Sequence, residues 1–149
     1  MGFSLLELII SVSLLFIIGV ASVFILQNQL HGTLETDAEV MASRLIEAQT
    51  RAIAGVSNTG WGVRFHNATA TTPYYALFSG SSFATSTLTY YLSGLVEFQS
   101  PGAGNITDVA FSKLSGTLSA STTIIIRLKT DSAKTKTITV TDKGKISVE

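Results

Sequence analysis

The 149-residue sequence has no cysteine, and its two prolines, Pro73 and Pro101, both lie in the second half. Without cysteine, the protein has no disulfides, thiolate metal sites or cysteine nucleophiles. Charge is also scarce: only 13% of positions are charged, and ten basic residues balance ten acidic ones. This composition argues against a disordered chain and against a wholly basic nucleic-acid binder.

Catalytic signatures are also missing from the sequence. The only two histidines are His31 and His66, and no Gly-rich phosphate loop or Gly-x-Ser-x-Gly elbow is present. The aromatic residues of the second half fit strand packing better than a sugar platform: Trp61, Tyr74, Tyr75, Tyr90 and Tyr91. We therefore expect a protein that is not an enzyme and has no metal or cofactor.

The N-terminal region is the most apolar part of the chain. No charged residue occurs for 19 residues from Leu8 to Leu26, and as a helix this run would extend about 28 Å, close to the hydrocarbon thickness of a bilayer. A secretory signal peptide would have a shorter apolar core followed by small residues, whereas this run ends in Ile25-Leu26-Gln27-Asn28. We expect residues 3–26 to form a transmembrane helix half that stays in the membrane.

Residues 27–56 have the pattern of an amphipathic helix. Apolar residues recur at steps of three and four: Leu30, Leu34, Ala38, Met41, Leu45, Ala48 and Ala52. No proline separates this stretch from the apolar run, and Gly55 is a typical stop signal. The sequence therefore predicts one helix from about Phe3 to Ala54, with a membrane half and an amphipathic half.

Residues 57–149 are predicted to form a β-rich head. Eight short β-prone runs alternate with Gly, Ser and Asn, and we expect strands at 61–66, 74–78, 87–92, 96–99, 109–114, 122–129, 135–140 and 145–148. In the last pair, Ile138 and Val140 match Ile146 and Val148 across a four-residue turn, which indicates a hairpin. An antiparallel sheet or small β-sandwich needs a cover, and the apolar helix stripe can supply it. The fold class is α+β.

The start of the sequence resembles the cleavage and methylation motif of type IV prepilins and type II secretion pseudopilins. The motif is Gly2-Phe3-Ser4-Leu5-Leu6-Glu7, directly followed by the apolar run. The resemblance implies cleavage after Gly2 by a membrane prepilin peptidase, N-methylation of Phe3, and a glutamate, Glu7, at the fifth mature position. Residues 1–2 would then be a leader remnant, so either the true start lies upstream or the leader is unusually short.

Glu7 has a physical interpretation that does not depend on the family. A carboxylate in a membrane helix costs a few kcal/mol unless it is paired or reaches the interface. After cleavage, the nearest cation of fixed position would be the ammonium of Phe3, in the same chain or in a neighbouring subunit. That attraction is poorly screened in lipid and could set the register of subunits in a filament. The alternative is an interfacial carboxylate near the end of an ordinary single-span anchor.

A second resemblance covers the rest of the chain. The order of Arg44–Gly55, Trp61-Gly62-Val63, Tyr74–Phe78 and the closing Ile138–Val148 segment is similar to the GspH/FimT group of minor pseudopilins and pilins. Two features of many major pilins are missing, a proline about twenty mature residues in and a C-terminal cysteine pair. The resemblance therefore implies a minor pilin or pseudopilin.

Some members of that group bind DNA, which leaves an alternative open. Residues 127–149 contain six basic and three acidic residues, and Lys143 and Lys145 lie in the closing turn. A local charge of about three gives little affinity for phosphates at physiological salt, so a DNA-binding or adhesive tip pilin is the second hypothesis. A plain membrane-anchored β domain is the third.

The leading expectation is a structural subunit of a type IV pilus-like filament or secretion pseudopilus. It would sit in the bacterial inner membrane as a single-pass protein, with its head outside the cytoplasm, before it enters the filament. Its expected partners are other pilin subunits, the prepilin peptidase and N-methyltransferase, an inner-membrane assembly platform, and the lipid bilayer.

Overall fold

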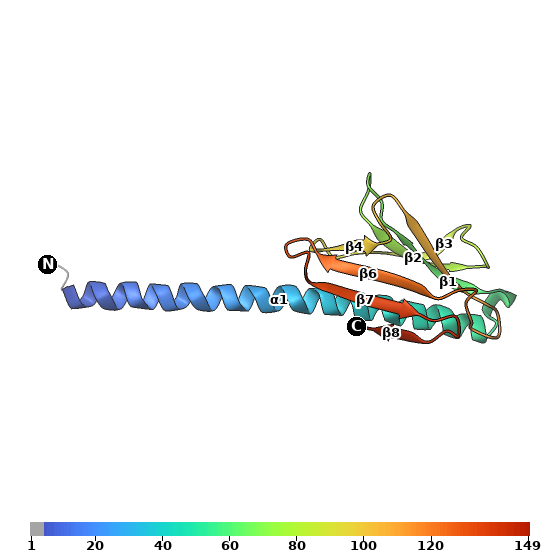
Figure 1. The fold of residues 1–149 in the computed structure, drawn as a ribbon, viewed down its shortest axis with the longest axis horizontal. Helices are drawn as coiled ribbons and strands as arrows, with labels where there is room; N and C mark the ends of the chain where they lie inside the picture. Colours follow the sequence, from blue (N-terminus) through green and yellow to red (C-terminus); the bar gives the residue numbers. More distant parts are fainter. Residues whose placement is uncertain (1–4) are drawn as a thin grey trace. The chain divides into compact units, whose positions relative to one another are not determined.

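The computed structural model describes the backbone of residues 5–149 and all of their side chains except those of residues 6 and 20–31. The chain divides into two compact units, Met1–Gly32 and Thr33–Glu149, and each is described by itself. Helix α1 is Leu5–Ile53 (Figure 1). The predicted helix, Phe3 to Ala54, agrees to within two residues, and its first two residues lie outside the described part of the chain.

Helix α1 ends where the sequence predicts. The Ala54 amide still donates to the Thr50 carbonyl at 2.9 Å, and Gly55 then adopts φ +65°. Glycine takes this left-handed conformation without the steric penalty that a Cβ brings, so it ends the helix and turns the chain. A short 3₁₀ helix, η1 (Val56–Asn58), leads into the first strand.

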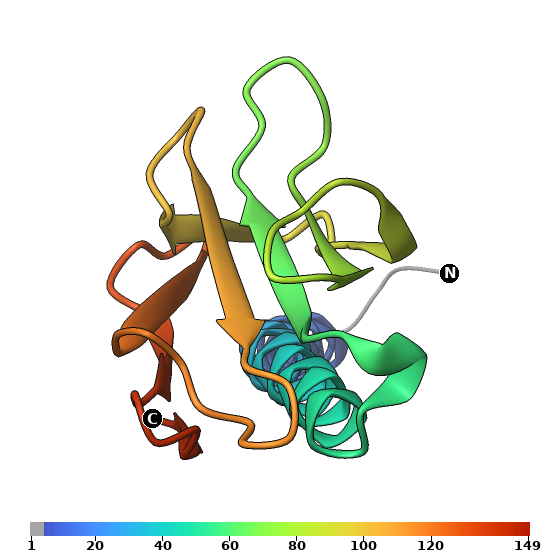
Figure 2. The same cartoon turned by 90° about the vertical axis from the view of Figure 1, so that its right-hand side faces the viewer.

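The head contains two antiparallel sheets of four strands. One has the order β3-β2-β1-β5 and the other β4-β6-β7-β8 (Figure 1). The strand bounds are β1 Trp61–His66, β2 Tyr74–Ser79, β3 Ser86–Tyr91, β4 Val96–Ser100, β5 Ile106–Phe111, β6 Thr122–Leu128, β7 Thr135–Val140 and β8 Ile146–Val148. Both sheets place one face on the part of α1 that belongs to the head, and they approach it from two sides (Figure 2).

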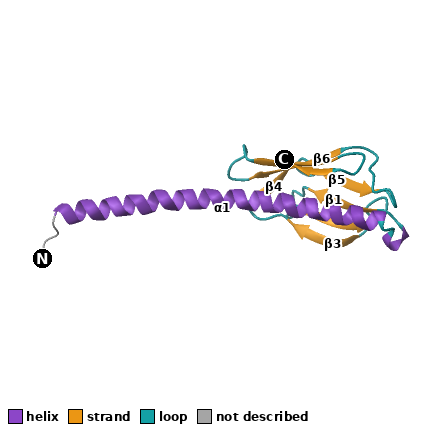
Figure 3. Ribbon diagram, turned by 90° about the horizontal axis from the view of Figure 1, so that it is seen from below, coloured by secondary structure: helices purple, strands orange, loops and turns teal. Residues whose placement is uncertain are grey.

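The apolar helix stripe forms the centre of this core. Of the seven predicted stripe residues, Leu34, Ala38, Met41, Leu45, Ala48 and Ala52 are buried; the Leu30 side chain lies outside the described ones. The sheets contribute large buried side chains, among them Phe65, Phe111, Ile124, Ile126 and Ile138. Strands lie on both sides of the helix when the molecule is seen from below (Figure 3). The expected cover of sheet by helix is confirmed for the head.

The predicted strands are found with one clear displacement. The 135–140 strand has the predicted bounds, and the closing hairpin pairs Ile138 with Val148 and Val140 with Ile146, as expected. The strand predicted at 109–114 is instead β5, Ile106–Phe111. Its register is fixed by β1, which pairs from His66↔Ile106 to Trp61↔Phe111. Leu114 has φ +67° and donates its amide to Ala52, so this apolar residue belongs to a turn.

The membrane segment is not confirmed. Among the residues that the structure describes, no helix is both long and apolar enough to count as a candidate membrane span. The predicted span, residues 3–26, includes positions whose backbone or side chains lie outside the described ones.

Candidate functional surfaces

The predicted processing site lies outside the described residues, which begin at Leu5, so Gly2 and Phe3 stay predictions. Glu7 lies in the first turn of α1 and is exposed. A negative side chain in the first turn favours the helix, because the helix macrodipole is positive at that end. Glu7 therefore stabilises the start of the helix. This effect is compatible with the predicted role in subunit register and separate from it.

The described side chains of the first unit form an apolar surface. Every large apolar side chain described between Leu5 and Ile18 is exposed, and Phe16 reaches 73%. The hydroxyls of Ser11 and Ser13 donate to the carbonyls of Glu7 and Ile9, four residues back, at 2.8 Å. These serines satisfy their hydrogen bonds within the helix, which leaves a surface suited to an apolar environment such as lipid or other helices.

Gln49 ties the end of α1 to two turns of the head. Its side-chain amide donates to the carbonyls of Gly116 at 3.1 Å and Gly144 at 2.8 Å. Gly144 has φ +81°, and a Cβ there would collide with the Gln49 amide, so the turn needs glycine for both backbone and space. Sequence reasoning gave Gln49 no role. No local signal identifies it, because its partners lie 67 and 95 residues away.

A charged cluster on α1 joins the helix to the first sheet. Glu47 accepts hydrogen bonds from Arg44 at 2.9 Å and from Arg51 at 2.6 Å. The guanidinium of Arg44 lies 4.5 Å from the centre of the Tyr90 ring, and that of Arg51 lies 4.8 Å from the Trp61 ring. Both arginines therefore form cation–π contacts with the sheet while Glu47 holds them in place.

The hydrogen bond from Arg44 lowers the pKa of Glu47 below its ordinary value of 4.5, and Arg51 acts in the same direction. A carboxyl whose pKa is lower in the folded state stabilises the fold above its unfolded pKa and loses this effect as pH falls through the folded pKa. We expect Glu47→Gln to lower the melting temperature of the full chain at pH 7 by more than it does at pH 3. Thermal unfolding of both chains at the two pH values measures the difference.

The matched control for this prediction is Glu39→Gln. Glu39 is exposed on the same helix and makes no hydrogen bond or ion pair among the described residues. Its loss should change the melting temperature little at either pH. An equal effect of Glu47→Gln at both pH values would contradict the role of the cluster.

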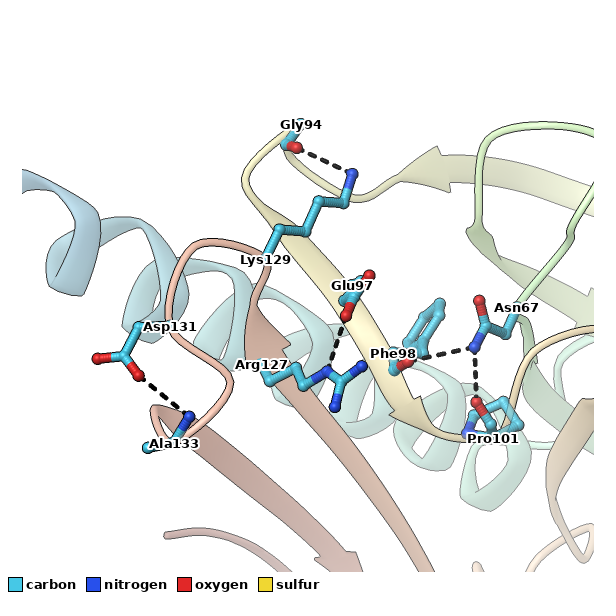
Figure 4. Close-up of polar contacts among 9 residues, drawn as sticks. All are labelled: Asn67, Gly94, Glu97, Phe98, Pro101, Arg127, Lys129, Asp131 and Ala133. Atoms are coloured by element: carbon cyan, nitrogen blue, oxygen red, sulfur yellow. Dashed lines mark hydrogen bonds and ion pairs between the residues drawn. The ribbon is translucent and has the colours of Figure 1, made fainter.

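The C-terminal basic residues do not gather into one surface. Arg127 pairs with Glu97 at 2.7 Å, and Lys129 donates to the Gly94 carbonyl at 2.9 Å (Figure 4). Lys136 pairs with Glu35 on α1 at 3.2 Å. Within the described residues, no side-chain partner is seen for Lys134, Lys143 or Lys145.

Lys143 and Lys145, the predicted ligand-binding residues, are exposed in the turn between β7 and β8. Lys134 precedes β7 at the opposite end of that strand, and a strand of six residues separates its ends by about 20 Å. Two neighbouring lysines and one distant lysine would neutralise few charges of a polyanion, so its affinity for this surface would be low.

Of the two histidines, only the side chain of His66 belongs to the part of the chain that the structure describes. His66 is the last residue of β1, as expected, and its ring contacts the Tyr74 ring edge to face, with centroids 5.1 Å apart. The His31 side chain lies outside the described ones. Among the described residues, no group of three or more His, Asp or Glu side chains could hold a metal ion.

The turn after β1 carries the main buried polar side chain of the head, Asn67. Its amide donates to the carbonyls of Phe98 at 3.2 Å and Pro101 at 2.9 Å (Figure 4). Phe98 lies on β4, and Pro101 follows that strand directly. Because Asn67 follows β1, these hydrogen bonds link the two sheets. Asn67 is thus a structural clamp, and no local pattern in the sequence predicts this role.

Comparison with solved structures identifies the fold. No protein-family model matches the chain, and no curated protein was found as a relative. Two crystal structures of the type IV minor pilin FimU from Pseudomonas aeruginosa strain PAO1 do match it. For one, the TM-score is 0.54 at 18% identity, and the match covers 78% of this chain and 92% of that crystallised FimU chain. The other has a TM-score of 0.57 at 15% identity and covers 85% and 92%. The chain therefore has an α+β, pilin-like fold.

Proposed function

We propose that this chain is a structural subunit of a type IV pilus-like filament, and more specifically a minor pilin. The observation that carries the proposal is the combination of two features in one chain. Residues 33–149 form a compact head, in a chain whose fold is similar to that of a minor pilin over 78–85% of its length, and the described side chains at 5–18 present an apolar surface. A folded head joined to an exposed apolar helix is suited to anchoring followed by assembly with other copies of such helices.

The finer parts of the proposal rest on the sequence. The chain is cleaved after Gly2 by a prepilin peptidase, Phe3 is methylated, and Glu7 guides subunit register. Before assembly, the uncharged run from Leu8 to Leu26 holds the chain in the bacterial inner membrane, and an assembly platform there transfers it to the filament. The organisation is a leader at 1–2, a membrane helix half at 3–26, an amphipathic helix half at 27–56, and the β-rich part of the head at 57–149. We assign the chain no catalytic role and no cofactor.

Two related functions stay as alternatives. A subunit of a type II secretion pseudopilus would share the fold and the processing, and the order of motifs that resembles the GspH/FimT group fits both. A DNA-binding tip pilin would use Lys143 and Lys145. The structure offers little for the DNA alternative, because Arg127, Lys129 and Lys136 already have partners.

The processing step tests the proposal directly. The full chain is expressed with and without a prepilin peptidase, and intact-mass spectrometry reads the N-terminus. We expect a chain that begins with N-methylated Phe3 in the presence of the peptidase and an uncut chain in its absence. A Gly2→Val variant should remain uncut. If the chain still begins at Met1 while the same peptidase cleaves another prepilin, the filament assignment fails.

A further inference from the structure

The outer face of the β3-β2-β1-β5 sheet carries a row of side chains that crosses all four strands. His66 pairs with Ile106 on β5 and with Tyr74 on β2, and Tyr74 pairs with Tyr91 on β3. Directly paired residues point to the same side of a sheet. The neighbours Phe65, Tyr75 and Tyr90 point the other way, since Tyr75 and Phe65 are buried and Tyr90 contacts Arg44 of α1. We call Ile106, His66, Tyr74 and Tyr91 the cross-strand row.

The three rings of the cross-strand row contact one another in sequence, and both ends of the row are open to solvent. The ring centroids are 5.1 Å apart for His66 and Tyr74 and 6.3 Å apart for Tyr74 and Tyr91, in edge-to-face geometry. Tyr91 is 65% exposed and Ile106 is 47% exposed. The expected packing role fits Trp61 and Tyr75, which are buried, whereas Tyr91 contacts the Tyr74 ring and leaves most of its surface exposed.

The side chains next to the row carry no net charge. Arg64 and Asp108 face each other on β1 and β5 and form a two-pronged ion pair, with N–O distances of 2.7 and 2.6 Å. They are the only Asp, Glu, Lys or Arg residues in the four strands. The ring of Phe83 lies 3.9 Å from the Arg64 guanidinium. The cation of this face is thus neutralised by its partner and covered on one side by an aromatic ring.

The charge and the side-chain types of this sheet face favour one chemical class of ligand over others. A nucleic acid or an anionic polymer would need free cations, because its affinity comes largely from neutralised phosphates or carboxylates. A peptide that extends the sheet would bind along a strand edge, whereas the row lies on the face. Aromatic rings beside hydroxyl and carboxylate acceptors suit a neutral sugar, whose C–H faces stack on rings while its hydroxyls find polar partners. Thr89 and Asp108 lie two residues along the strands from Tyr91 and Ile106, on the same face. The Thr89 hydroxyl donates to Ser86 at 3.2 Å and can still accept a hydrogen bond, as can the carboxylate of Asp108.

We propose that the cross-strand row is a binding platform for a neutral polysaccharide, with Tyr91 and Tyr74 as its stacking residues. This site goes beyond filament assembly and makes no use of Glu7, Lys143 or Lys145. Its failure would leave the filament assignment untouched, because that assignment is tested by processing and assembly.

The test uses the full chain in a detergent without a sugar headgroup. Cellohexaose, maltohexaose and chitohexaose are titrated by calorimetry, beside a heparin hexasaccharide, single-stranded DNA and a proline-rich peptide. We expect at least one neutral hexasaccharide to bind, and Tyr91→Ala to weaken its binding about tenfold or more, as loss of a stacking ring does. The matched control is Leu88→Ala, on the same strand but the opposite face, where Leu88 is 44% exposed. It should change affinity less than about twofold.

Three results would overturn the proposal. The first is that none of the neutral hexasaccharides binds. The second is that Tyr91→Ala and Tyr74→Ala bind a neutral hexasaccharide as well as the parent chain does while their circular dichroism is unchanged. The third is that Tyr91→Ala abolishes binding of the DNA or the peptide instead, which would assign the row to a different class of partner.

Discussion

Glu7→Gln is expected to leave the chain synthesised and folded but to reduce its incorporation into filaments about tenfold or more. Glutamine keeps the size of the side chain and removes its charge, so it cannot form the pair that the proposed function assigns to Glu7 and the terminal ammonium of Phe3. In a poorly screened apolar environment, even one lost ion pair exceeds the 1.4 kcal/mol or so that corresponds to a tenfold change. Immunoblots of sheared filaments and of membranes measure the distribution of the chain between the two.

The control for this prediction is Glu39→Gln, which removes the same charge from an exposed position of the same helix. It should leave incorporation unchanged. Filaments that contain the Glu7→Gln chain at the parental level would contradict the pairing mechanism.

The position of Glu7 in the first turn of α1 offers a competing explanation. Removing a negative charge there also costs about 0.3–1 kcal/mol of helix stability through the macrodipole. A dipole effect would reduce helical circular dichroism and would be rescued by Glu7→Asp, because aspartate carries the same charge. A register effect would leave the dichroism unchanged, and the shorter side chain of aspartate should rescue assembly only in part.

Much of the fold could be predicted because periodic burial leaves a clear pattern in sequence. The steps of three and four from Leu34 to Ala52 predicted the buried helix face, and the alternation in Ile138 and Val140 predicted the closing hairpin. Gly55 indicated the end of the helix because helices commonly end at a glycine in the left-handed conformation, and Gly55 adopts that conformation. These signals are local, so a single sequence contains them.

The other parts of the fold depend on contacts between residues that lie far apart in the sequence. The arrangement of the strands as two separate sheets is set by pairings such as His66↔Ile106, which no local pattern encodes. The contacts of Gln49 with Gly116 and Gly144 are invisible for the same reason. Alternation shows that Tyr74 and Tyr75 face opposite sides of a strand, but it does not show which side is buried. The cross-strand row could therefore not be separated from the core by sequence.

Leu45→Ala is expected to destabilise the head by about 2–5 kcal/mol, the usual cost of removing most of a buried leucine. Leu45 is 0% exposed and lies in the middle of the helix stripe that both sheets cover. For a domain of this size, such a loss should lower the melting temperature by roughly 10 °C or more. Thermal unfolding of the full chain, followed by the near-ultraviolet dichroism of the buried Trp61, measures the change.

The neighbouring residue provides the control, because Ile46 lies about 100° further around the helix, outside the buried stripe, and is 52% exposed. Ile46→Ala should change the stability of the head by no more than about 0.5 kcal/mol.

The two variants also separate folding from assembly. If the exposed side of α1 contacts other subunits, Ile46→Ala will reduce incorporation into filaments at an unchanged melting temperature, whereas Leu45→Ala will reduce it only at temperatures where the head unfolds. Equal losses of stability in both variants would contradict the packing of α1 on the two sheets.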